Sequence, residues 1–126
     1  MTVAALWDVQ VDVYSIIEAA LAADSVEVFD RVPPGDQGEH CRIDGFAVAD
    51  ASPKNAEIGR HSFMVHYFVP NVHGQARAKQ QISKIHAALM AGAVQGKKLD
   101  FEYLEVTPET TGTETHAIAR YTITLK

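Results

Sequence analysis

The chain has one cysteine, Cys41, so it cannot form an intrachain disulfide, and this count fits a reducing compartment. It has no apolar run of the ~20 residues that cross a bilayer. Its opening segment, MTVAALWDVQVDVYSIIEAAL, lacks the basic start of a signal peptide. It also has no run rich in Lys or Arg, and its net charge is −5. These absences disfavour tight binding to nucleic acid or to an anionic membrane surface.

Patterns of catalytic and metal-binding residues are equally scarce. His40 and Cys41 are adjacent, and His61 and His66 are five residues apart, so within strands each pair points to opposite faces of a sheet. No spacing of His, Cys, Asp or Glu typical of a metal site occurs, and no glycine-rich phosphate loop is found. The sequence therefore predicts no catalytic residue, no metal and no cofactor.

The most regular part of the chain lies between residues 60 and 91. Residues 60–69 alternate as a strand, and neither face of that strand is cleanly polar, which predicts that both faces are covered. A turn containing glycine leads into a helix that ends near Gly92. The apolar stripe of this helix consists of Ala78, Ile82, Ile85 and Leu89.

A first helix is predicted over residues 3–23, because apolar residues recur there at helical spacing. The stripe consists of Leu6, Val9, Val13, Ile16, Ile17, Ala20 and Leu21. Trp7, Val11 and Tyr14 lie partly off this stripe. They indicate either a wide core face, the commoner situation for apolar helix residues, or a second surface for a partner.

Further strands are predicted over residues 26–32, 41–49, 99–106 and 116–125, with a bulge at Gly45. The element order is α-β-β-β-α-β-β. This order predicts one domain over residues 1–126, in the α+β class, with a mostly antiparallel sheet flanked by two helices.

Candidate contacts for protein partners lie on the predicted exposed loops and on the charged side of the second helix. Loops 50–59 and 107–115 are long for so small a domain, and long loops often carry binding residues. The candidates are Asp50, Lys54, Glu57, Arg77, Lys79, Lys84, Glu109 and Glu114.

Three stretches of the chain resemble the tail-terminator (tail-completion) family of long-tailed phages and gene-transfer agents. The first is the opening helix ending in ALAAD, followed by a short strand and a Pro-containing loop. The others are HSFMVHYFVPNVHGQARAKQQISKIHAALMAG and the closing strand THAIARYTITL. The turn VPNVHG departs from the pattern, because many relatives have a more polar turn containing Ser or Arg there. This departure concerns partner specificity more than fold.

The resemblance implies a non-enzymatic virion protein that assembles in the bacterial cytoplasm as a ring, a hexamer in the family. The ring binds the head-proximal end of the finished tail tube, ends polymerisation of the tube protein and presents a surface to the neck or head-completion protein. DNA passes through the lumen without specific binding, which an acidic chain suits, and no membrane is involved.

Two alternatives stay open at this point. One is a head–tail joining (neck) protein of similar size. The other is a small cytoplasmic α+β enzyme or ligand-binding dimer, with His61, His66 or Cys41 near a cleft between the sheet and the helices.

Overall fold

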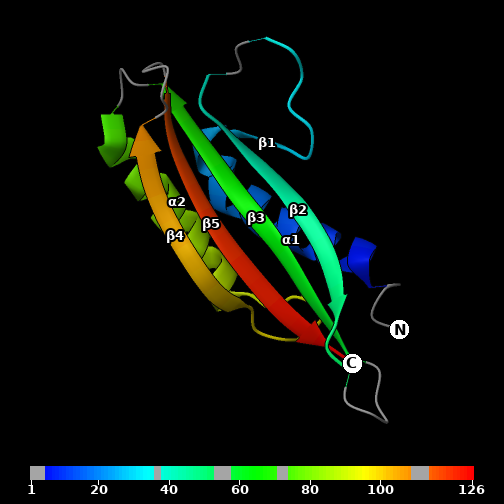
Figure 1. Ribbon diagram of the computed structural model, residues 1–126. Helices are drawn as coiled ribbons and strands as arrows, with labels where there is room; N and C mark the ends of the chain where they lie inside the picture. The colour runs from blue at the N-terminus through cyan, green and yellow to red at the C-terminus, as the bar shows by residue number, and fades with distance from the viewer. Residues whose placement is uncertain (1–4, 36–37, 53–57, 71–73, 109–113) are drawn as a thin grey trace.

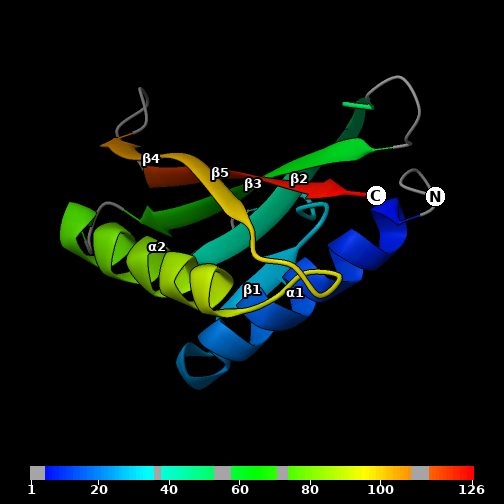
Figure 2. The ribbon, with the colours of Figure 1, turned by 90° about the horizontal axis from the view of Figure 1, so that it is seen from below.

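The computed structural model describes residues 5–35, 38–52, 58–70, 74–108 and 114–126. Two helices lie side by side on one face of a five-stranded sheet, and α1 lies towards β1 whereas α2 lies towards β4 (Figure 1; Figure 2). The elements are α1 (Leu6–Leu21), the short 3-10 helix η1 (Ala22–Asp24), β1 (Glu27–Phe29), β2 (His40–Asp50), β3 (Gly59–Pro70), α2 (Gly74–Ala91), β4 (Asp100–Pro108) and β5 (Glu114–Leu125).

The strand order across the sheet is β1-β2-β3-β5-β4. Strands β2, β3, β5 and β4 are antiparallel neighbours, whereas β1 is parallel to β2 and pairs only with its first residues, His40–Arg42. The predicted α+β class, the mostly antiparallel sheet and the element order are confirmed. Within the described residues, no helix is long and apolar enough to cross a membrane.

The core lies between the sheet and the two helices. Alternate residues of the long strands point to the helices, because successive side chains of a strand face opposite sides. Burying one large apolar side chain there contributes roughly 1.5–3 kcal/mol. The buried set includes Val9, Val13, Ile17 and Leu21 of α1, Ala78, Ile82, Ile85 and Leu89 of α2, and Phe63, Val65, Tyr67, Val69, Ala117, Ala119, Tyr121 and Ile123 of the sheet.

A β-bulge interrupts β2 where the sequence predicted one. The register between β2 and β3 shifts between Asp44 and Ala47, and Gly45 has a φ of +70°. A side chain at this position would be strained, because L-residues rarely adopt positive φ. A Cβ there would also lie 3.3 Å from Cε of Met64. After the bulge, Phe46 packs against the core, so the bulge returns an aromatic ring to the helix side of the sheet.

Two expectations need correction. The strand predicted over residues 26–32 is shorter in the structure and consists of Glu27–Phe29. Only these three residues pair with β2. The outer face of β3 was expected to be covered, yet among the described residues both helices lie on the opposite face (Figure 2). His66 on this outer face is nevertheless buried, because neighbouring side chains of the same face surround it.

Candidate functional site

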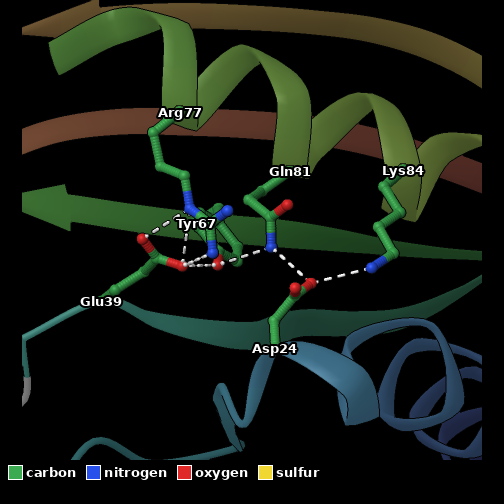
Figure 3. A network of polar contacts seen from close by, with 6 residues as sticks. All are labelled: Asp24, Glu39, Tyr67, Arg77, Gln81 and Lys84. Carbon is green, nitrogen blue, oxygen red and sulfur yellow. Dashed lines mark hydrogen bonds and ion pairs between the residues drawn. The ribbon is translucent and has the colours of Figure 1, made fainter. Parts of the chain in front are cut away.

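A polar network joins the start of α2 to the segments before β1 and β2 (Figure 3). Nη2 of Arg77 donates to Oε2 of Glu39 at 2.8 Å, and Nε of Arg77 donates to Oε1 at 3.0 Å. The hydroxyl of Tyr67 donates to the same carboxylate at 2.5 Å. A two-point contact between guanidinium and carboxylate fixes orientation as well as distance. Glu39 therefore holds the first turns of α2 against β3.

A second carboxylate continues this network along α2. Oδ2 of Asp24, in η1, accepts from Nζ of Lys84 at 2.8 Å and from Nε2 of Gln81 at 3.0 Å. Gln81 also donates to the hydroxyl of Tyr67 at 3.2 Å, which links the two carboxylates (Figure 3). The bond from Lys84 lowers the pKa of Asp24, and burial raises the pKa of Tyr67. The Asp24 carboxylate is thus held ionised by a cation of α2.

The candidate contact residues fall into three groups in the structure. Arg77 and Lys84 are bonded within the subunit, to Glu39 and Asp24 respectively, as described above. Lys79 is exposed, and Asp50 is exposed with Oδ1 accepting from the backbone N–H of Ser52 at 2.9 Å. Glu114 begins β5 and is half-buried. The others, Lys54, Glu57 and Glu109, lie outside the described residues.

The open face of the sheet carries a hydrogen-bonded row that the sequence did not indicate. Oδ1 of Asp44 lies 2.9 Å from Nε2 of His66, and Nδ1 of His66 lies 2.8 Å from Nε2 of His116. Nε of Arg42 lies 2.9 Å from the other oxygen of Asp44. The carboxylate can only accept, so Nε2 of His66 carries a proton. In the neutral ring Nδ1 is then the acceptor, and His116 donates to it.

Aromatic rings surround this row and give the face its apolar part. The ring of Phe68 stacks on His40 at 4.8 Å and on His116 at 4.5 Å, and Arg42 lies 5.4 Å from its centroid. Register places these residues together, because His40 pairs with Phe68 and Phe68 pairs with His116. The residues of this cluster come from three strands, β2, β3 and β5, that are far apart in sequence. Their spacing in the sequence therefore could not predict the cluster.

The stability of the fold should fall on the acid side because of His66. Burial lowers its pKa below the usual 6.5 and outweighs the nearby Asp44 carboxylate, which raises it. The unfolded chain therefore binds a proton at His66 at a higher pH than the folded chain does. The stability that depends on a neutral His66 is therefore present above pH 6.5, the pKa in the unfolded chain, and is lost as the pH falls below that value. Urea midpoints between pH 8 and pH 5 would measure the loss.

The matched variant for this pH dependence is His66→Gln, compared with His86→Gln on the helix side of the sheet. The acid-side fall should be shallower in His66→Gln and should persist in His86→Gln. Parallel pH profiles for the native chain and His66→Gln would contradict the assignment.

Large apolar side chains are exposed at two opposite ends of the fold. Trp7 and Val11 on α1 are 67% and 42% exposed, so they do not belong to the core face. Phe101 and Tyr103 on β4 are 46% and 41% exposed. The first pair was predicted to lie partly off the helical stripe, whereas the exposure of the second pair was not predicted. The only sequence signal for Phe101 and Tyr103 is that two aromatic residues occupy alternate positions of a predicted strand. The sequence did not indicate that this strand lies at the edge of the sheet.

A groove runs beside the exposed pair on α1. Its volume is about 400 Å³, and it is lined by Trp7, Gln10, Val11, Tyr14, Ser15, Glu18 and Asp30. The hydroxyl oxygen of Tyr14 is buried and has no hydrogen-bond partner among the described residues. Burial, assisted by the charge of Asp30, raises the pKa of Tyr14. The groove is therefore apolar with an acidic rim and an unsatisfied donor.

The residues named for an enzyme do not converge. Cys41 and His61 both point into the core, but they lie about 20 Å apart along the sheet at ~3.3 Å per residue, because Cys41 pairs with Tyr67. His66 lies on the opposite face. Burial raises the pKa of the Cys41 thiol to about 12, which disfavours the reactive thiolate. In the described part of the chain, no three His, Cys, Asp or Glu residues are placed to hold a metal ion.

A solved structure shares this fold. It is the virion of a native gene transfer agent (GTA) particle, and one of its chains matches this chain with a TM-score of 0.75 and 24% sequence identity. The match covers 90% of this chain and 90% of that chain. No protein-family model matches the chain, and no curated protein matches it. The similarity therefore extends over nearly the whole chain.

Proposed function

We propose that this chain is a structural protein of a phage-like or gene-transfer-agent virion. The observation that supports this most is the fold similarity to a chain of the GTA virion, which extends over 90% of both chains. The sequence resemblance to the tail-terminator family points to the same kind of particle. The catalytic candidates do not converge on one site, which favours assembly over an enzymatic function.

Within that particle, the proposed role is the ring that ends the tail tube at its head-proximal end. Residues 1–126 act as one domain in this role, and copies of the chain form the ring, a hexamer by family analogy. One face of the ring binds the tail tube protein and the other binds the neck or head-completion protein. DNA passes through the lumen without specific binding, which the net charge of −5 favours.

Specific features of the subunit support a ring. In a ring, each subunit contacts its two neighbours through two different surfaces, and the rotation from one subunit to the next must add up to a full turn. This subunit has different exposed apolar groups at its α1 end and at its β4 end. Polar networks hold α2 to β3 and η1, which gives a rigid subunit. We propose Lys79, Asp50 and Glu114 as partner contacts, with Lys54, Glu57 and Glu109 on the neighbouring loops.

The proposal is tested by the distribution of tail lengths in particles assembled without this chain, measured by electron microscopy. Overlong or ragged tails without heads are expected, and the native chain supplied in trans should restore uniform tails. Tails of normal length that fail to join heads would instead make the chain a neck protein. Unchanged particles would overturn the virion role.

A further inference from the structure

Strand β2 continues well beyond β1, its neighbour at one edge of the sheet. β1 ends at Phe29, opposite Arg42, and Pro33 and Pro34 then follow, which lack the N–H that a strand ladder needs. Figure 1 shows the chain turning away from the sheet after β1 while β2 runs on. Residues 43–50 of β2 run beside β3 on one side and, among the described residues, beside no strand on the other. This open edge is about as long as an average strand.

The open edge of β2 lacks the charged side chains that protect the opposite edge of the sheet. β4, the strand at that opposite edge, carries three exposed acids, Asp100, Glu102 and Glu105. Charged side chains of this kind hinder pairing with another chain. Between Asp44 and Asp50, in contrast, β2 has only the uncharged residues GFAVA. The edge of β2 is therefore open to an added strand, whereas the edge of β4 is protected.

The groove on α1 lies alongside this open edge. α1 packs against β2, and Asp30, the residue after β1, is among the residues that line the groove. Burial raises the pKa of Tyr14 most, and the charges of Asp30 and Asp44 raise it further, so its ring lies near the open part of β2. The buried hydroxyl of Tyr14 has no acceptor among the described residues, and a backbone carbonyl of an added strand would supply one. Trp7 and Val11 offer exposed apolar surface to the same strand.

The charges on this surface have one sign. A second hollow, of about 410 Å³, is lined by residues from the end of α1 to β1 and shares Glu18 with the groove. Glu27 lines the second hollow and Asp30 lines the groove, and in the described part of the chain no Lys or Arg lines either. All three carboxylates are exposed and bond no cation among the described residues. Charge complementarity therefore favours a basic occupant.

We infer that this surface binds an extended, basic segment of another protein, which adds to the open edge of β2 as a further strand. One carbonyl of the segment accepts from the hydroxyl of Tyr14. Apolar side chains of the segment pack on Trp7 and Val11, and its Lys or Arg side chains pair with Glu18 and Asp30. In such strand addition, main-chain hydrogen bonds give affinity and alternate side chains give specificity. The inference rests on the proposed function only for the source of the segment, which is then a virion protein other than this chain.

A selection from a display library of random peptides against the full chain tests the chemistry of the occupant. From Trp7 to Glu18, α1 spans roughly 17 Å, which about five residues of strand cover, so peptides of about nine residues suffice. The enriched peptides should contain Lys or Arg and should alternate with apolar residues. Enrichment of acidic or helical peptides, or no enrichment at all, would overturn the inference.

N-methylation of the most enriched peptide separates strand addition from simple adhesion to the groove. A strand pairs with one neighbour through the amides of alternate residues, so methylating one alternate set should abolish binding. Methylating the other set is the matched control and should leave binding nearly unchanged. Trp7 is the single tryptophan of the chain, so its fluorescence reports the binding of any peptide without Trp. Equal effects of the two sets would contradict strand addition.

Substitutions of exposed acids locate the bound peptide on the chain. Glu18→Lys and Asp30→Lys should each weaken its binding several-fold at low salt. Glu105→Lys makes the same charge change on β4 and is the matched control, so the affinity should not change. Circular dichroism melts confirm that each variant folds. An effect of Glu105→Lys without an effect of Glu18→Lys would place the peptide on β4 and overturn the inference.

Hydrogen exchange of the backbone amides adds a readout on the open edge itself. The peptide should slow the exchange of alternate amides within residues 43–50, as measured by NMR. Unchanged exchange there would show that the peptide does not pair with β2. Protection of the same amides in the free chain, rising with its concentration, would make the occupant a second copy and would also overturn the inference.

The inference and the proposed function fail in different experiments. If tails become overlong without the chain but no basic peptide binds, the terminator role stands and this docking surface is wrong. If basic peptides add to β2 but tail lengths do not depend on the chain, the docking surface stands and the role is wrong.

Discussion

Replacing Phe63 by alanine is expected to destabilise the fold by about 3–5 kcal/mol, which is a large part of the ~5–15 kcal/mol that typically stabilises a domain. Phe63 is fully buried in β3, with its ring between those of Phe46 and Tyr121 at centroid distances of 5.4 and 5.6 Å. The expected loss of stability has two parts, the lost free energy of burying the ring and the cost of the cavity that its removal leaves. A urea titration followed by circular dichroism measures the change in midpoint.

Trp7→Ala is the matched control for the loss of a large aromatic side chain. Trp7 is 67% exposed, so its removal should change the free energy of unfolding by less than about 1 kcal/mol in dilute solution. Equal losses in the two variants would mean that Trp7 belongs to the core of the subunit.

Glu39→Ala should cost about 2–4 kcal/mol although Glu39 lies in a connecting segment outside the strands. Its carboxylate is only 18% exposed and accepts hydrogen bonds from Arg77 and Tyr67. Its removal leaves a half-buried guanidinium without its carboxylate and a buried phenol without its acceptor, and an unpaired buried group bears its full desolvation cost. The shift in thermal or urea midpoint measures this cost, and Glu39→Gln should recover only part of it.

A more exposed ion pair of the same network is the comparison. Lys84 is 41% exposed and pairs with Asp24, so Lys84→Ala should cost no more than about 1 kcal/mol. In a double-mutant cycle, Glu39→Ala and Tyr67→Phe should be strongly non-additive, because they remove the same hydrogen bond. Additive effects would show that the bond contributes little to stability.

Local periodicity was enough to predict most of the fold. The alternation within β3 and β5 and the 3.6-residue stripes of α1 and α2 gave their types and nearly their bounds. Gly45 was predicted as a bulge because a glycine within a strand pattern often marks one. These features depend on residues that are close together in the sequence, so they can be predicted from a single sequence.

The candidate site depended on contacts between distant residues, and most of it was not predicted. Arg77 and Glu39 are 38 residues apart in sequence, and His66 and His116 are 50 apart. Periodicity assigns each of them to a face but does not say which strands are neighbours. The place of β5 between β3 and β4 decides that His66 and His116 meet, and also that β4, with Phe101 and Tyr103, forms an edge.

The position of β5 also has a consequence for synthesis. β3 and β4 have no contact with each other as strands until residues 114–125 pair between them. A nascent chain that stops earlier has β2 paired with β3 but lacks the strand that joins them to β4. Pairing over such sequence distances is slow to form, and its absence leaves strand edges exposed. Prematurely terminated chains should therefore be recognised by cellular proteases more readily than the full chain.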